Sequence, residues 1–136
     1  MYKPEEEELQ AWCAEWQEIL SLKHWGIQVK YERKHKMSAG CYAEVHCKPG
    51  ILSAVIKILD PSDYDDPYIP QNIELSLLHE LVHIPLMMFS NHEEGSAEDV
   101  LQEQFVESMS KALLRCKHIH AEAENKERLC RMIMRH

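Results

Sequence analysis

Apolar residues alternate with polar ones over residues 25–59, which is the pattern of β-strands. The segments before and after these residues have helical periodicity, so the chain should combine a sheet with flanking helices. In WGIQVKYER, which begins at residue 25, every second residue is apolar, as in a half-buried strand. AGCYAEVHCK, residues 39–48, alternates more weakly, and ILSAVIKILD, residues 51–60, is rich in Ile and Val. Three successive strands with short polar links predict a small, mostly antiparallel sheet.

An amphipathic helix is expected before the sheet, over residues 5–22. Pro4 suits a first helical turn, and the run of glutamates that follows complements the helix dipole. Its expected apolar face recurs at spacings of three and four and consists of Leu9, Trp12, Trp16, Ile19 and Leu20.

Two further helical stretches are expected after the sheet, beyond a loop at residues 60–72 that contains three prolines. Asn72 is a suitable N-cap for a helix containing IELSLLHELVHI. Ser96 is the next N-cap, with Asp99 at the third position of a capping box. No Gly or Pro occurs after that point, so the remainder forms either one long helix or two helices broken near residues 118–121.

Composition favours a single domain over residues 1–136 and excludes several classes of function. The net charge of −8 argues against nucleic acid as the main partner, since that binding depends on neutralising phosphates. No apolar run approaches the roughly 20 residues that span a bilayer, so no membrane association is expected. The acidic start does not resemble a secretory signal, and a cytoplasmic location is expected. The five cysteines form no C-x-x-C pair, so reduced thiols are expected rather than disulfides.

The sequence HELVH, residues 79–83, is the motif that indicates chemistry. On a helix, His79 and His83 project from one face and can bind the same metal ion. Glu80 lies one residue further around, where it can act on a metal-activated water as general base. Expected core residues on the same helix are Leu75, Leu78, Val82 and Leu86. The alternative is that the two histidines bind no metal and lie on a solvated helix face.

A catalytic zinc ion has three protein ligands and an open position, so a third ligand is expected downstream. On the last helical stretch, Leu101, Phe105, Val106, Met109, Ala112 and Leu113 share one broad apolar face at 100° per residue. Glu103 lies at the edge of that face, beside Val106 and Ser110, whereas Glu107 is rotated further toward solvent. Glu103 is therefore the preferred third ligand.

The order of these features resembles the minimal zincin fold, and LLHELVHI followed by LQEQFVESMSKAL resembles the gluzincin pattern. The chain is especially similar to small, single-domain metallopeptidases of bacterial and phage genomes, the minigluzincin type, over roughly residues 12–114. The resemblance implies an α+β domain with zinc ligands His79, His83 and Glu103 and catalytic Glu80. It also implies that the edge of strand 51–59 holds an extended peptide or protein substrate by β-augmentation.

Several residues depart from that pattern or have other candidate roles. Pro85 lacks the amide that would bond to Leu81, so the helix should kink or end just after the second ligand. His92 and Tyr68 are candidates for stabilising an oxyanion, although both are more typical of plain loop residues. The CKHIH stretch after Leu114 could form a second metal site, but exposed helix histidines are the favoured interpretation.

Two functions remain open at this point. The first is a zinc-dependent metallopeptidase, a hydrolase that cleaves a peptide bond with Glu80 as general base. The second is a catalytically silent, zinc-binding interaction module with a zincin fold and a phage or mobile-element origin. The presence of Glu80 beside the two histidines favours the enzyme, because a purely structural site needs no base.

Overall fold

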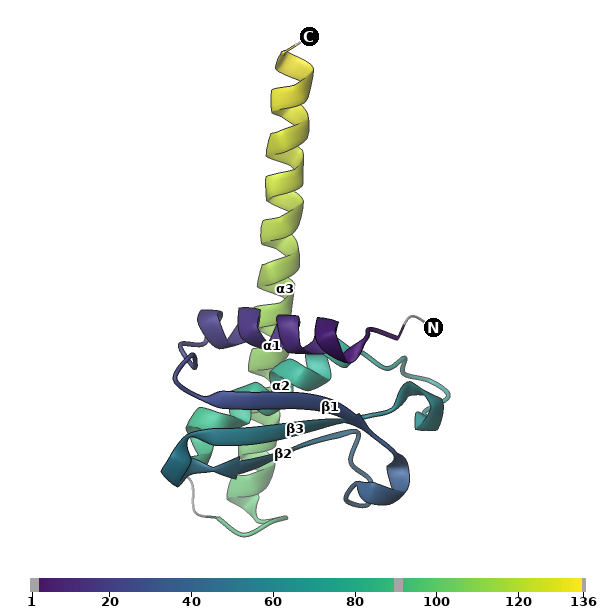
Figure 1. Ribbon diagram of the computed structural model, residues 1–136, viewed down its shortest axis with the longest axis vertical. Coiled ribbons are helices and arrows are strands. Elements are labelled where there is room, and N and C mark those ends of the chain that lie inside the picture. The colour runs from purple at the N-terminus through teal and green to yellow at the C-terminus, as the bar shows by residue number, and fades with distance from the viewer. Residues whose placement is uncertain (1–2, 90–91, 136) are drawn as a thin grey trace.

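The computed structural model describes residues 3–89 and 92–135, which form an α+β fold with three helices and a three-stranded sheet (Figure 1). The elements run in the order α1 (Glu6–Ile19), β1 (Gly26–Glu32), β2 (Ala43–Lys48), β3 (Ser53–Leu59), α2 (Ile73–Met87) and α3 (Ala97–Met134), with single 3₁₀ turns at Lys34–Lys36, Pro49–Ile51 and Pro61–Asp63. Within the described ranges, no helix combines the length and apolar character that a bilayer crossing requires.

The sheet is mixed, so the expectation of a mostly antiparallel sheet was wrong. Its strand order is β1-β3-β2, with β3 parallel to β1 and antiparallel to β2. β3 is the most apolar strand, with Ala54, Ile56 and Ile58 buried, and the central place gives it partners on both sides. The short turn after β2 makes β2 and β3 a hairpin, while β2 itself lies at an edge.

α1 covers the outer edge of β1. The Gln10 side chain donates a hydrogen bond to the Ile27 carbonyl at 2.7 Å and accepts one from the Val29 amide at 3.1 Å. These bonds satisfy backbone groups that would otherwise form an exposed strand edge.

The buried face of α1 differs from the expected one, and the helix ends at Ile19 rather than at residue 22. Leu9, Cys13, Trp16 and Gln17 are buried, whereas Ile19 is 51% exposed. The Gln17 amide is satisfied there, because it donates to the carbonyls of Leu22 and Trp25 at 3.1 and 2.9 Å.

α2 runs through the centre of the molecule, between the sheet and α3 (Figure 1). Asn72 caps it as expected, by accepting a hydrogen bond from the Leu75 amide at 3.0 Å. Leu78 and Val82 are buried as expected, Leu75 and Leu86 are only partly buried, and Leu77, Leu81 and Ile84 are fully buried. Pro85 lies within the last turn, and the helix ends two residues later, at Met87.

α3 is one helix of 38 residues, which settles the choice between one helix and two. Its Ser96 N-cap accepts a hydrogen bond from the Asp99 amide at 3.2 Å, as the capping box predicts. The first half packs against α2, and the second half projects away from the body (Figure 1).

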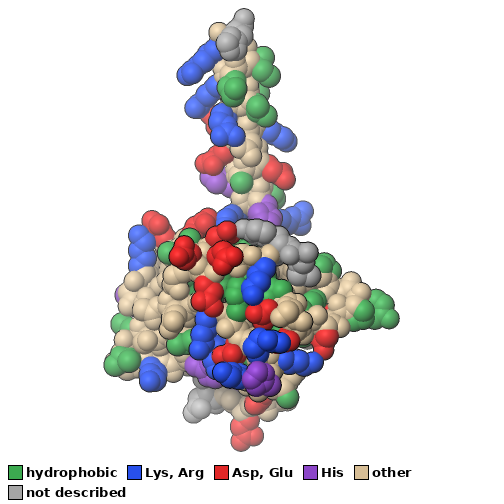
Figure 2. Space-filling model, turned by 45° about the vertical axis from the view of Figure 1, so that its right-hand side comes forward, with side chains coloured by type: hydrophobic (Ala, Val, Ile, Leu, Met, Phe, Trp, Pro, Cys, Tyr) green, Lys and Arg blue, Asp and Glu red, His purple; other side chains and the backbone are tan. Residues whose placement is uncertain are grey.

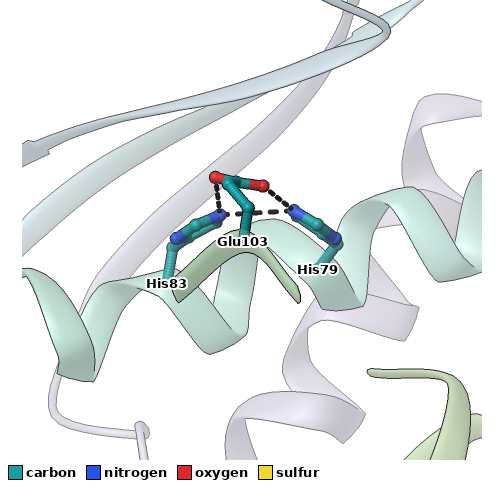
Figure 3. A group of neighbouring side chains, drawn as sticks. All are labelled: His79, His83 and Glu103. Carbon is teal, nitrogen blue, oxygen red and sulfur yellow. Dashed lines mark hydrogen bonds and ion pairs between the residues drawn. The ribbon is translucent and has the colours of Figure 1, made fainter. Parts of the chain in front are cut away.

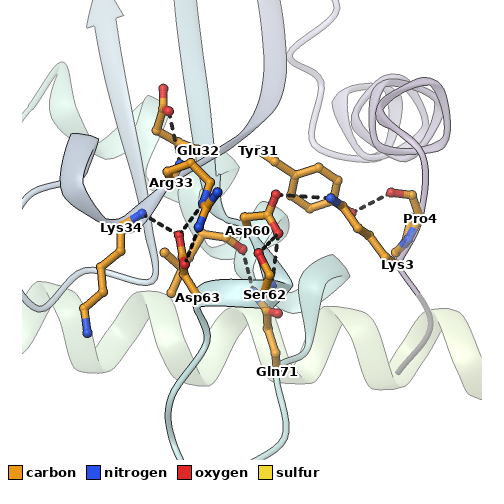
Figure 4. Close-up of polar contacts among 11 residues, drawn as sticks. Lys3, Pro4, Tyr31, Glu32, Arg33, Lys34, Asp60, Ser62, Asp63 and Gln71 are labelled. Atoms are coloured by element: carbon orange, nitrogen blue, oxygen red, sulfur yellow. Dashed lines mark hydrogen bonds and ion pairs between the residues drawn. The ribbon is translucent and has the colours of Figure 1, made fainter.

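Polar side-chain contacts connect the three helices to one another and connect the 60–72 loop to the end of β1. The Glu74 carboxylate accepts from Trp16 Nε1 at 2.9 Å and from Lys117 Nζ at 2.5 Å, so it joins α1, α2 and α3. At the start of the loop, Arg33 binds both carboxylate oxygens of Asp63, at 2.7 and 2.9 Å (Figure 4). The Glu74 contacts hold α2 against the other two helices, and the Arg33 contact fixes the start of the loop.

Candidate metal centre

The two histidines of HELVH lie on the same face of α2, as their four-residue spacing predicts. Their Nε2 atoms are 3.2 Å apart. The side chains of His79 and His83 are 17% and 9% exposed, so each ring is held by its surroundings with one edge facing the pocket. The backbone of one helix thus supplies two aligned nitrogen donors.

α3 adds a carboxylate to this pair (Figure 3). One oxygen of Glu103 is 2.9 Å from His83 Nε2, and the other is 3.1 Å from His79 Nε2. Glu103 lies one turn before the buried residue Val106, where α3 packs on α2. The structure therefore brings together the three residues that the sequence singled out as ligands.

The geometry of this group fits a small divalent cation. One donor atom from each residue can be chosen so that all lie within 4.8 Å of one another. Donors at tetrahedral zinc, about 2.1 Å from the ion, are separated by roughly 3.4 Å, slightly more than the separations of 2.9–3.2 Å here. Imidazole nitrogen and carboxylate oxygen suit zinc, and they also suit several other divalent ions.

Glu107 contacts His79 on the opposite side of the ring from Glu103. Its Oε2 is 2.8 Å from His79 Nδ1, the ring nitrogen that faces away from Glu103. A carboxylate at Nδ1 favours the tautomer with its proton there and leaves Nε2 free to donate its lone pair. Sequence reasoning left Glu107 only as an alternative ligand. Glu107 lies one helical turn after Glu103 in the sequence, and that spacing places both carboxylates on the side of α3 that faces the histidines.

Glu80 is 8% exposed and lines the same pocket as His79, His83 and Glu103. Burial raises the pKa of Glu80 to about 7, with Glu103 and Glu44 acting in the same direction and His79 opposing them. A carboxyl group of that pKa can exchange a proton near neutral pH. Burial also lowers the pKa of His83, which favours the neutral, ligating form of its ring.

The pocket of about 860 Å³ beside these residues is bounded by α2, α3 and the edge strand β2. Ala43, Glu44 and Val45 of β2 line it directly. The expectation that strand 51–59 offers a free edge was wrong, because β3 is paired on both sides. The available edge beside the site belongs to β2, whose ladder partner in the described chain is β3 alone.

The two candidates for oxyanion stabilisation differ in position. His92 lines the pocket, and its Nε2 lies 3.1 Å from Asp99 Oδ1. Tyr68 is 91% exposed in the 60–72 loop and is not among the residues that line the pocket.

A second metal site in the CKHIH stretch finds no support within residues 3–89 and 92–135. Cys116, His118 and His120 are exposed on α3. The His79, His83 and Glu103 group is the one cluster with metal-binding spacing among those residues.

Comparisons with protein-family models, curated proteins and solved structures give no match to this chain.

Proposed function

We propose that this chain is a zinc-dependent metallopeptidase of the gluzincin-like, minimal zincin type. The observation that carries the proposal is the buried Glu80 beside a His79, His83 and Glu103 donor set, at a pocket bounded by an edge strand. A structural zinc site is closed by four protein ligands, whereas this group supplies three and borders open space.

The chemistry divides between the metal and the protein side chains. His79, His83 and Glu103 would hold the ion, which when bound would acidify a water molecule and polarise the substrate carbonyl. Glu80 would accept the proton of the attacking water and return it to the leaving amine nitrogen. Burial of Glu80 favours its protonated form, whereas the charge of a bound ion would favour the carboxylate that accepts the proton. Glu107 would keep His79 Nε2 directed at the ion through its contact with Nδ1.

The edge of β2 supports a peptide substrate rather than a small molecule. An extended peptide can add to such an edge through main-chain hydrogen bonds, which align its scissile bond independently of side-chain identity. β2 borders the pocket over Ala43–Val45, beside Glu80 and His83. The substrate strand would therefore run along β2, across the donor set.

The remaining pocket wall favours basic side chains in the substrate. Glu44, Glu94 and Asp99 line the pocket in addition to the proposed ligands. Such a cluster of one charge raises the local concentration of oppositely charged ligands and falls in strength with added salt. We expect peptides with Lys or Arg near the scissile bond to be cleaved faster than matched peptides with Glu, with a smaller difference at high salt.

The direct test combines metal analysis with peptide-library hydrolysis for the wild type, Glu80→Gln and His79→Ala. We expect about one zinc ion per chain in the wild type and in Glu80→Gln, and loss of zinc in His79→Ala. Hydrolysis should fall at least 100-fold in Glu80→Gln, within the range for removing a general base. Wild-type hydrolysis by Glu80→Gln would show that the catalytic assignment is wrong. Bound zinc without cleavage of any library member would instead support the interaction module.

A further inference from the structure

The protruding part of α3 exposes several large apolar side chains. Every described residue from His118 to Arg135 is exposed, and these residues include Ile119, Leu129, Met132, Ile133 and Met134 at exposures of 54–86% (Figure 2). We call residues 115–135 the α3 tail. A solvated helix of this length gains little from its own hydrogen bonds, and helices in proteins are stabilised mainly by packing of an apolar face. The tail therefore calls for a partner surface.

The spacing of residues on the tail matches a coiled-coil seam. Steps of three and four residues connect, in order, Cys116, Ile119, Ala123, Lys126, Cys130 and Ile133. These alternate between the a and d positions of a seven-residue repeat, and five of the six lack a charge. A membrane surface would need an apolar face but not this strict repeat, so the spacing favours another helix.

The seam points away from the body. Leu114 is buried against the body, and Cys116, two residues later, is rotated from it by about 200°. Phe105 and Met109 continue the same seam toward the start of α3, and they are 50% and 41% exposed. A second helix can therefore lie along the seam without meeting the domain from which the tail emerges.

The residue sizes along the seam identify the second helix as another copy of this chain. The a positions, Cys116, Ala123 and Cys130, are small, and the d positions, Ile119, Lys126 and Ile133, are large. Two copies running in opposite directions, with Cys116 level with Ile133 of the other copy, pair a small with a large residue in all six layers. Facing small and large residues is how packed layers interdigitate.

Charge favours the same arrangement. In a parallel pair, Lys126 would face the Lys126 of the other copy, and Glu122 would oppose Glu127 across the seam. In the antiparallel pair, Lys126 faces the small side chain of Ala123 and lies almost level with Glu122 of the other copy. We propose that the α3 tails of two copies form an antiparallel coiled coil over residues 116–133, about 26 Å long, with the two domains at its opposite ends.

The oligomeric state of the full chain tests the proposal, by sedimentation equilibrium over a wide concentration series with a chelator present. We expect a mass that approaches twice the 16.0 kDa of one chain. Ile119→Glu places a charge in two layers of each dimer and should raise the dissociation constant roughly 1,000-fold. Ala121→Glu is the matched control, because it adds the same charge at the outward f position and should leave the constant within about twofold. Circular dichroism checks that both variants remain folded.

Cysteine cross-linking with a short bismaleimide tests the direction. In Cys130→Ser, a parallel pair would cross-link through Cys116 of both copies, whereas the antiparallel pair should give no covalent dimer through the tail. Adding Ile133→Cys should then create one, mapped by mass spectrometry to residues 116 and 133 of different copies. A monomeric wild type, a dimer unaffected by Ile119→Glu, equal dissociation by Ala121→Glu, or cross-links between identical positions would overturn the proposal. Binding to anionic vesicles by a monomeric chain would likewise overturn it, in favour of a membrane-surface helix.

Discussion

If His79, His83 and Glu103 hold zinc as proposed, replacing Glu107 by Ala should weaken zinc binding without removing any of these three ligands. The carboxylate contacts His79 Nδ1 at 2.8 Å, and its side chain is 42% exposed. Loss of such an orienting partner typically costs 10- to 100-fold in metal affinity, and the exposure of Glu107 places it in the lower part of that range. We expect the zinc dissociation constant to rise about 10- to 30-fold, or by roughly 1.4–2.0 kcal/mol.

The same change can be followed as a stability difference. At a free zinc concentration of 100 times the wild-type dissociation constant, binding adds about 2.7 kcal/mol to the free energy of unfolding. The weakened site of Glu107→Ala would gain only about 0.9–1.4 kcal/mol at that concentration. Urea unfolding with and without zinc measures both values, and competition with a chromophoric chelator gives the dissociation constants directly.

Lys111→Ala is the matched control for this experiment. Lys111 Nζ lies 3.3 Å from the other Glu107 oxygen, on the solvent side, so its removal disturbs Glu107 but leaves the His79 contact. An exposed pair of this kind contributes about 0.3–0.5 kcal/mol, so zinc affinity should change by about twofold at most. Glu107→Gln keeps an acceptor for Nδ1 and should fall between Ala and the wild type. An unchanged dissociation constant in Glu107→Ala, or an equal loss in Lys111→Ala, would refute the orienting role.

Three further predictions concern the scaffold. Hydrogen bonding to Arg33 holds the pKa of Asp63 well below its usual value of 3.8, so its stabilisation is complete above about pH 4 and is lost as pH falls below that. Urea unfolding should show a shallower loss of stability below pH 4 in Asp63→Asn than in the wild type. Gln17→Leu leaves the buried Trp25 carbonyl without its side-chain donor, while the Leu22 carbonyl keeps the Trp25 amide at 3.0 Å, and should lower the free energy of unfolding by about 1–3 kcal/mol in the same assay. Burial raises the pKa of the Cys13 thiol to about 12, so iodoacetamide at pH 8 should label Cys116 and Cys130 quickly in the dissociated chain, where both are exposed, and Cys13 only after unfolding.

The parts of this structure that could be predicted from sequence are those set by local interactions. The Asn72 and Ser96 caps depend on amides three residues away, and both form as expected. The alignment of His79 with His83 needs only a helix, and Glu103 needs only the packing of α3 on α2 through Val106.

Strand order could not be predicted in the same way, because it depends on pairing between distant segments. Alternation in β1, β2 and β3 shows which side chains are buried but not which strands are neighbours. β3 is central and has one face buried throughout, at Ala54, Ile56 and Ile58, whereas no residue of β2 is fully buried. The free edge beside the metal group was consequently assigned to the wrong strand.

The error in the expected face of α3 has a different origin and bears on the proposed dimer. Counting apolar residues grouped Leu101, Phe105 and Met109 with Val106 on one broad face, yet they are 64%, 50% and 41% exposed whereas Val106 is buried. The residues that do pack on the body, Val106, Ser110 and Leu114, include a serine and form a separate stripe.

In a helical-wheel projection, two neighbouring apolar stripes merge into one broad apolar arc. Such a projection does not show that different partners cover the two stripes. The body covers the stripe of Val106 and Leu114. The second stripe runs from Phe105 to Ile133 with a seven-residue repeat, and in the proposed antiparallel pair its 116–133 portion is covered by another copy. On that reading, Ile119→Glu should change assembly and leave the domain intact, whereas Val106→Ala should lower the stability of the domain and leave assembly unchanged. The two stripes of α3 would then have separable roles, one in holding Glu103 at the metal centre and one in joining two such centres.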